Sequence, residues 1–258
     1  IRDSNKTAAT VDENGTVTAL RPIETVTITA VYKTNPALTC SWNLKITRTK
    51  GYITKQMLDN LDLTSIKKVM ITAHPDDETL WGGGHLIEGE YLVVCMTHGW
   101  NPKRRTAFEQ TMRTTNDKYL ILDYPDVRKT FSNGKYETDM LSTCKNAMQE
   151  DINLILSYKK WDLIATHNPF GEYGKFLHKT ISQMVTQCYN KMTNKSATLY
   201  YFGRYYNSSN KIPGEQIAPE LLAIKNSMVG RYYPTAKGAI DAFGHMIPYE
   251  NWLLPSEW

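Results

Sequence analysis

Two segments of this 258-residue chain gather side chains that bind metals and move protons. The first, residues 73–78, reads Ala-His-Pro-Asp-Asp-Glu and directly follows a short apolar run. The proline fixes its own φ and pushes His74 toward an extended backbone, so His74, Asp76 and Asp77 should present their side chains in different, defined directions. A histidine and a carboxylate three residues apart suit Zn²⁺, and a second carboxylate can take a proton from metal-bound water. Taken alone, the segment also fits a polar turn that caps the next helix.

The second segment, residues 166–178, reads Thr-His-Asn-Pro-Phe-Gly-Glu-Tyr-Gly-Lys-Phe-Leu-His and again follows an apolar run. Catalytic zinc sites generally have three protein ligands and one open position. The third ligand should therefore come from the end of another strand, and His178 is the candidate, placed on the first turn of the following helix. His167 is expected to support the loop through hydrogen bonds rather than to bind metal.

Alternating apolar and amphipathic runs predict the elements that hold these segments. Strands are expected at 68–73, 91–97 and 161–166, and helices at 104–120 and 139–158. Strands that alternate with helices favour an α/β fold, Rossmann-like, with a mostly parallel sheet and flanking helices. Ligands bind outside the carboxyl ends of the strands in such sheets, which is where both segments begin.

The first 49 residues have a different hydrophobic pattern, in which polar and apolar positions alternate and no helical periodicity is present. Short antiparallel strands are expected at 10–11, 16–20, 25–32 and 42–47. Residues 9–19, Ala-Thr-Val-Asp-Glu-Asn-Gly-Thr-Val-Thr-Ala, resemble the C-terminal part of a bacterial immunoglobulin-like domain whose first strands would lie upstream. That resemblance implies an extracellular or cell-surface protein. The expected domains are therefore residues 1–49 and residues 50–258.

Composition is that of an ordinary globular protein, with 41% hydrophobic and 22% charged residues and a net charge of +4. The basic residues form short clusters beside expected strands and helices, so solvated faces are favoured over a nucleic-acid surface. No stretch approaches the ~20 apolar residues of a membrane span. The four cysteines show no CxxC pair and no zinc-finger spacing.

The two segments together resemble the LmbE/PIG-L family of zinc-dependent deacetylases, with similarity over about residues 66–255. The resemblance implies metal ligands at His74, Asp77 and His178, a general base at Asp76, and Zn²⁺ or another divalent ion as cofactor. One position departs from the family pattern, because Lys175 stands where the family usually has the first histidine of Gly-His-x-x-His. A lysine there can stabilise an oxyanion or donate a proton; alternatively, activity is lost and only binding remains.

The expected function is hydrolysis of an N-acetyl group on an amino sugar or glycoconjugate. Trp100 and Tyr173 are predicted to stack on a sugar, since an apolar ring face suits its C–H face. Arg105, or its neighbour Arg104, is predicted to contact a substrate hydroxyl or phosphate, with a helix-surface ion pair as the alternative. Asn168 completes the predicted substrate-binding set. Two other functions stay open: an amidase acting on a thiol or peptide conjugate, and an inactive carbohydrate-binding module.

Overall fold

The computed structural model describes residues 2–129, 136–193 and 195–258, and the chain forms two compact units. Unit 1 comprises residues 1–52 and 123–150, and unit 2 comprises residues 53–122 and 151–258. Helix α4 (Asp139–Tyr158) contributes residues to both units. The expected domain boundary after residue 49 stays a prediction.

Unit 1 contains short antiparallel sheets. Its strands are β1 (Arg2–Asp3), β2 (Ala9–Val11), β3 (Val17–Ala19), β4 (Ile23–Val31), β5 (Thr39–Ile46), β9 (Arg128–Lys129) and β10 (Tyr136–Glu137). Strands β1, β4 and β5 form one sheet, β2 and β3 a second, and β9 and β10 a third. Ala9, Val26 and Ile28 form a small core, and residues 2–49 contain no helix. The predicted antiparallel strands are confirmed, whereas the immunoglobulin-like resemblance stays a prediction.

Unit 2 carries both segments singled out above. Its elements are α1 (Lys55–Asp59), β6 (Lys68–Thr72), α2 (Asp77–Glu88), β7 (Tyr91–Thr97), α3 (Pro102–Thr115), β8 (Lys118–Tyr124), β11 (Leu163–Thr166), α5 (Gly171–Gly174), α6 (Phe176–Lys191), β12 (Thr198–Tyr201), α7 (Pro219–Phe243), η1 (Gly244–Met246) and η2 (Pro255–Glu257). The last two residues of β8 belong to unit 1. No helix among the described residues is long and apolar enough to cross a membrane.

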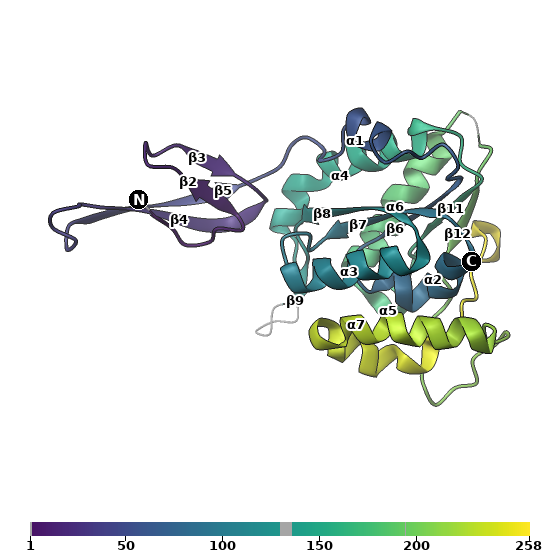
Figure 1. The fold of residues 1–258 in the computed structure, drawn as a ribbon. Helices are drawn as coiled ribbons and strands as arrows, with labels where there is room; N and C mark the ends of the chain where they lie inside the picture. Colours follow the sequence, from purple (N-terminus) through teal and green to yellow (C-terminus); the bar gives the residue numbers. More distant parts are fainter. Residues whose placement is uncertain (1, 130–135, 194) are drawn as a thin grey trace. The chain divides into compact units, whose positions relative to one another are not determined.

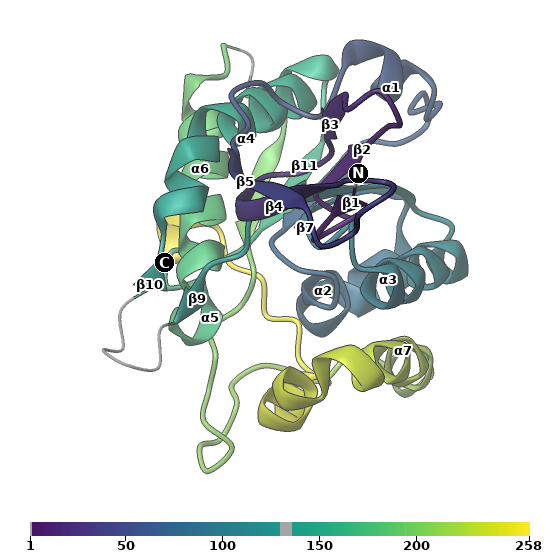
Figure 2. The same ribbon diagram turned by 90° about the vertical axis from the view of Figure 1, so that its left-hand side faces the viewer.

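A five-stranded sheet in the order β12-β11-β6-β7-β8 is the centre of unit 2. The pairs β12–β11, β11–β6 and β6–β7 are parallel. Helices α2 and α3 cover one face and α6 lies on the other, with α7 packed outside α2 and α3 (Figures 1 and 2). The predicted Rossmann-like α/β class is therefore confirmed. Strand order reverses between β6 and β11, which creates a crevice at the carboxyl ends of these neighbouring strands.

The helix predicted at 104–120 ends earlier than expected. Helix α3 stops at Thr115 because Asn116 adopts a left-handed conformation with φ of 59°, in which its backbone N–H donates to Met112. Strand β8 then begins at Lys118. The apolar residues after Asn116 belong to this edge strand, and helical spacing alone does not distinguish the two.

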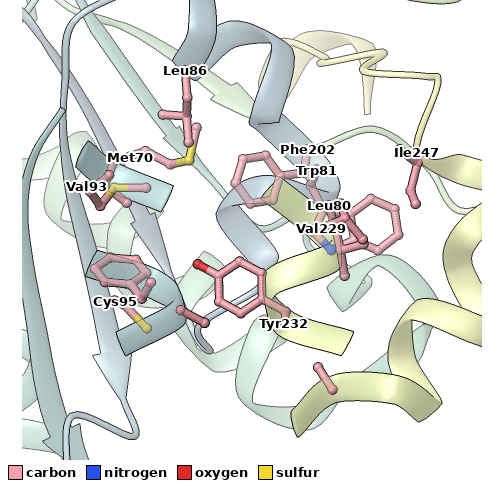
Figure 3. Close-up of a cluster of buried hydrophobic side chains, with 14 of the residues drawn as sticks. Met70, Leu80, Trp81, Leu86, Val93, Cys95, Phe202, Val229, Tyr232 and Ile247 are labelled. Carbon is pink, nitrogen blue, oxygen red and sulfur yellow. The ribbon is translucent and has the colours of Figure 1, made fainter. Parts of the chain in front are cut away.

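Aromatic and sulfur-containing side chains fill the space between the sheet, α2 and α7 (Figure 3). Met70, Trp81 and Phe202 are almost completely buried, and burial contributes ~1.5–3 kcal/mol for each such side chain. Helix α2 is kinked at Gly82, where a Cβ would lie 2.7 Å from the Met70 Cε atom. Tyr232 of α7 extends from this core toward the start of α2, where the first candidate segment lies.

Candidate metal centre

The two candidate segments begin side by side because their strands are paired. Thr166 at the end of β11 is in register with Ile71 near the end of β6. The loops are also linked directly, since the Ala73 backbone N–H donates to His167 Nε2 over 2.9 Å. Residues about 90 positions apart in sequence therefore meet in the crevice where the strand order reverses.

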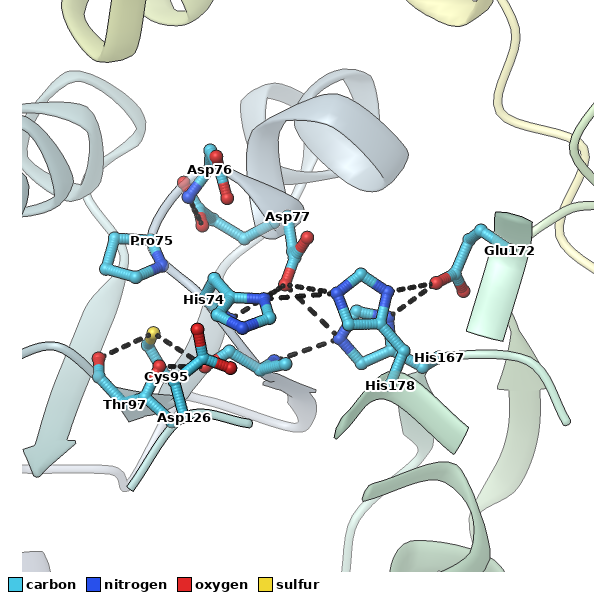
Figure 4. Close-up of polar contacts among 12 residues, drawn as sticks. His74, Pro75, Asp76, Asp77, Cys95, Thr97, Asp126, His167, Glu172 and His178 are labelled. Carbon is cyan, nitrogen blue, oxygen red and sulfur yellow. Dashed lines mark hydrogen bonds and ion pairs between the residues drawn. The ribbon is translucent and has the colours of Figure 1, made fainter. Parts of the chain in front are cut away.

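Three side chains converge in this crevice with their donor atoms almost in contact (Figure 4). His74 Nδ1 lies 3.2 Å from Asp77 Oδ2 and 3.1 Å from His178 Nε2, and His178 Nε2 lies 3.3 Å from the same carboxylate oxygen. All three residues are buried. Asp77 is also oriented by the His74 backbone N–H, which donates to Oδ2 over 2.7 Å. This is the ligand set predicted from the sequence, and its geometry can hold a metal ion.

A buried carboxylate fixes His178 from behind. Glu172 Oε2 lies 2.5 Å from His178 Nδ1 and 3.0 Å from His167 Nδ1. Because a carboxylate accepts, these contacts place a proton on each Nδ1 and leave the His178 Nε2 lone pair facing His74 and Asp77. Coordination of a metal through Nε2 requires that tautomer. The ligand atoms of His167, Glu172 and His178 also lie close enough together to hold an ion, but His167 Nε2 already accepts the Ala73 N–H.

Glu172 occupies a strained backbone position, with φ of 54° and ψ of −76°. Such conformations cost about 1–3 kcal/mol and persist where surrounding contacts impose them. Here its Oε1 accepts the Asn168 backbone N–H over 3.0 Å while Oε2 accepts both imidazoles. Burial alone would raise the pKa of Glu172, but the positive charges that His167 and His178 carry when both ring nitrogens are protonated, together with their hydrogen bonds, lower it to about 2.

Asp76 lies beside the three ligands but has different partners. Its carboxylate Oδ2 accepts a hydrogen bond from Arg104 Nη2 over 2.9 Å, and the same nitrogen donates to the Pro75 carbonyl oxygen over 2.9 Å. Burial raises the pKa of Asp76 to about 6 even though the Arg104 charge opposes that rise. A carboxylate with a pKa near neutrality is suited to accept and return a proton.

Asp77 has the opposite electrostatic environment. Burial by itself would raise its pKa, but the positive charges that His178 and His167 carry when doubly protonated hold the pKa of Asp77 well below its usual value. Adjacent carboxylates are thereby separated into one that stays ionised and one that can exchange a proton. This difference in pKa is compatible with the ligand and base roles predicted from the sequence, which stay predictions.

The backbone of Asp76 has φ of 138°, which a non-glycine residue rarely adopts. Glu78 holds it there, because Glu78 Oε2 accepts the Asp76 N–H over 3.0 Å. Its other oxygen accepts the Tyr232 hydroxyl over 2.5 Å and the Thr79 hydroxyl over 2.7 Å. Burial raises the pKa of Glu78 to about 7. Glu78 thus joins the loop to the hydrophobic core.

Lys175 lies between α5 and α6, three residues before His178. Its backbone N–H donates to Gly171 and its carbonyl accepts from Lys179. The side chain is half-buried, and no hydrogen bond or ion pair of it is present among the described residues. Its predicted catalytic role stays a prediction.

The residues predicted to bind substrate fall into different surroundings. Tyr173 is part-exposed, with its ring centroid 5.7 Å from that of His178 and stacked on Phe243 at 4.1 Å. Trp100 stacks on His98 at 6.2 Å, and the His98 ring lies 5.7 Å from that of His74. Both aromatic residues are therefore connected to the ligands by ring contacts.

Asn168 and Arg105 have other partners. The Asn168 side-chain amide donates to the carbonyl oxygens of Phe202 and Gly203, while its oxygen accepts two backbone N–H groups of its own loop. Arg105 forms an ion pair with Glu109 over 3.0 Å on the exposed side of α3. The structure thus places Arg105 in the alternative helix-surface pair and brings Arg104 to the site instead.

Sequence reasoning did not single out the role of Glu172. A signal was present, since a carboxylate six residues before His178 can reach its imidazole when the intervening loop folds back. Sequence reasoning also left Arg104 and Arg105 unresolved, because consecutive helical residues point about 100° apart and helix phase decides between them.

No protein-family model matches the chain. An uncharacterized protein of Acanthamoeba polyphaga mimivirus is 31% identical over 175 residues, which cover 61% of this chain and 67% of the viral protein. At this identity and coverage, the chain belongs to the same family as that viral protein.

Proposed function

We propose that unit 2 is a metal-dependent hydrolase that removes an N-acetyl group from an amino sugar or glycoconjugate. The observation that carries this proposal is the convergence of His74, Asp77 and His178, with ligand atoms 3.1–3.3 Å apart in a buried crevice. Glu172 supports a metal role further by leaving the His178 Nε2 lone pair directed at the other two residues. The donor set suits Zn²⁺ and also other divalent ions.

A divalent ion held by these residues would polarise the acyl carbonyl and lower the pKa of water. Asp76 is the proposed general base, because its carboxylate is buried next to the ligands and its pKa of about 6 leaves it ionised at neutral pH. Arg104 keeps that carboxylate oriented through a 2.9 Å hydrogen bond. After accepting a proton, Asp76 can return it to the departing amine.

Lys175 is the proposed source of positive charge for the oxygen that becomes negative during acyl transfer. Its place three residues before His178, at the start of α6, supports this role. Substitution of Lys175 by glutamine should then lower kcat more than it raises KM, because the developing charge exists only in the transition state.

Acetate release from a panel of N-acetylated sugars tests the proposed function. The intact chain would be compared after loading with Zn²⁺ and after removal of metal by a chelator. Release by the loaded protein alone is expected. Hydrolysis of an N-acylated thiol or peptide conjugate instead would indicate the alternative amidase. Sugar binding without any release, with metal bound at one ion per chain, would indicate a binding module and contradict the hydrolase.

We also propose that the protein acts outside the cell or at its surface. The support is the similarity of residues 9–19 to a repeat pattern of exported spacer modules, together with the antiparallel strands of unit 1. Fractionation of the native host, followed by immunoblotting, tests this; signal confined to the cytoplasm would refute it.

A further inference from the structure

A pocket of about 300 Å³ lies in unit 2 next to the candidate metal centre. Three parts of the chain form its walls: the segment that runs from the loop after β11 through α5 to the first turn of α6, the chain after β12, and the residue after η2. Among the residues of this pocket, Glu172 supports the proposed metal site and Tyr173 is predicted to contact substrate, and the others have no role in the function proposed above. Its lining combines aromatic rings with two cations.

The aromatic walls provide flat apolar surface. Phe170 and Trp258 have ring centroids 5.4 Å apart, and Tyr173 and Tyr205 have centroids 6.4 Å apart. Phe170 is 61% exposed and Tyr173 is 38% exposed, so large apolar surface is left open to solvent here. Such faces accept the C–H face of a sugar or another flat ring.

The two cations of the pocket are Lys179 and Arg204. Neither forms an ion pair with a carboxylate within the part of the chain that the structure describes. The Arg204 guanidinium lies over the Trp258 ring at 4.6 Å, which leaves its N–H groups available at the edge of that ring.

Glu172 is the acidic residue of the pocket lining, but it does not compete for these cations. One of its oxygens accepts the Asn168 N–H and the other accepts both imidazoles. The pocket therefore presents two positive charges without carboxylate partners beside apolar rings. That combination suits a ring-bearing anion, because Arg binds carboxylate and phosphate through paired N–H donors.

The pocket is also continuous with the candidate metal centre through shared residues. Tyr173 lines the pocket while its ring contacts that of His178 at 5.7 Å between centroids. Glu172 likewise lines the pocket and contacts His178 Nδ1. A ligand seated between the aromatic walls therefore lies one side chain away from a predicted metal ligand.

We propose that this pocket binds the carboxylate or phosphate of a ring compound, with Arg204 and Lys179 as the charge-recognising residues. We further infer that it selects the acidic portion of the substrate, and this second step rests on the proposed hydrolase function. Tyr173 would separate the recognition pocket from the reacting amide. Phosphate and carboxylate are both compatible with the two cations, and the choice between them is an outcome of the experiment.

Calorimetric titration of the intact chain with matched probes tests the binding. D-glucuronate and glucose 6-phosphate provide the two anions, and D-glucose provides the neutral ring. Arg204→Gln and Lys179→Gln should each weaken binding of the anionic probe by about tenfold, and added NaCl should weaken it in the unmodified chain. Lys191→Gln is the matched control, because Lys191 is an exposed lysine about 18 Å further along the same helix. Equal affinity for charged and neutral probes, or unchanged affinity in both pocket variants, would overturn the proposal.

A second set of measurements separates this proposal from the proposed function. N-acetylglucosamine, its 6-phosphate and N-acetylmuramic acid would be compared as substrates by acetate release. The expected result is a KM about tenfold lower for one of the two acids, a preference that Arg204→Gln removes while leaving kcat within twofold. Release with the same KM for all three compounds refutes the pocket assignment while the hydrolase stands. Charge-dependent binding without acetate release from any compound refutes the hydrolase while the pocket stands.

Discussion

Replacement of Glu172 by glutamine is expected to weaken metal binding without unfolding the chain. The carboxylate now receives three N–H donors, one on Oε1 from Asn168 and two on Oε2 from the imidazoles of His167 and His178. Glutamine offers one oxygen and one NH₂ group. Whichever way it is oriented, a buried N–H group faces another donor.

The magnitude follows from that mismatch. A buried donor left without an acceptor costs about 1–3 kcal/mol. When glutamine turns its oxygen toward Asn168, His178 Nδ1 no longer has a hydrogen-bond acceptor, and the tautomer with the proton on Nε2 becomes accessible. Loss of such an outer partner weakens metal affinity about 10–100-fold. That range corresponds to about 1.4–2.7 kcal/mol and is consistent with one mispaired donor.

A competition titration with a chromophoric zinc chelator measures this affinity. Glu250→Gln is the matched control, since Glu250 is another buried carboxylate of unit 2 that accepts backbone and side-chain donors, from Gly84, His85 and Lys225. The control should lower the urea midpoint and leave zinc affinity unchanged. Equal zinc affinity in Glu172→Gln and the unmodified chain, or an equal loss in both variants, would refute the role given to Glu172.

Three further predictions follow from the structure. Gly83→Ala should destabilise unit 2 by about 1–3 kcal/mol in urea denaturation, because the new Cβ would lie 2.9 Å from Cγ of the buried Lys225. Burial raises the folded-state pKa of Asp117 to about 7, so between pH 4 and pH 7 the folded state binds more protons than the unfolded state. The free energy of unfolding therefore falls as pH rises through that window. Asp117→Asn should make this fall smaller. Arg104→Gln should move the rising limb of kcat/KM to higher pH, because the Arg104 charge lowers the pKa of Asp76.

Controls for these predictions come from the same chain. Gly238→Ala adds a Cβ within α7 with nothing inside 4 Å, so it should be neutral or stabilising by up to about 1 kcal/mol. A loss of stability there comparable to that of Gly83→Ala would show that crowding at Lys225 is not the cause. Identical pH dependence of stability in Asp117→Asn and the unmodified chain would contradict the burial effect. An Arg104→Gln profile that is unchanged or displaced to lower pH would exclude Asp76 as the titrating base.

The sequence predicted the candidate site where metal-binding side chains directly follow a predicted strand. His74 and Asp77 are close in sequence, and their predicted roles follow from a local motif. His178 joins them because β6 and β11 are neighbours in a parallel sheet. The α/β class follows from the alternation of strands and helices. The longer antiparallel strands of unit 1 follow equally from period-2 patterning, because β2, β4 and β5 each contribute residues to a small core.

Other features depend on tertiary contacts that no local pattern encodes. Asn168 looks like a substrate-binding residue in a polar loop, yet all its amide donors and acceptors are used to hold that loop. Arg104 and Arg105 differ only by helix phase, and only the packing of α3 decides which one reaches Asp76. Lys225 would be expected on a surface, but it is fully buried against Glu250, and the small size of Gly83 makes room for it.

The central claim is that three buried ligands hold a metal and that Asp76 serves it as base. The most direct test is to measure, on the same samples, metal content and acetate release for the zinc-loaded chain and for Asp76→Asn. Asparagine keeps an oxygen for Arg104 but cannot take the proton, so the variant should retain one ion per chain and lose at least about a hundredfold in kcat. A variant that keeps both its metal and its rate would contradict the account.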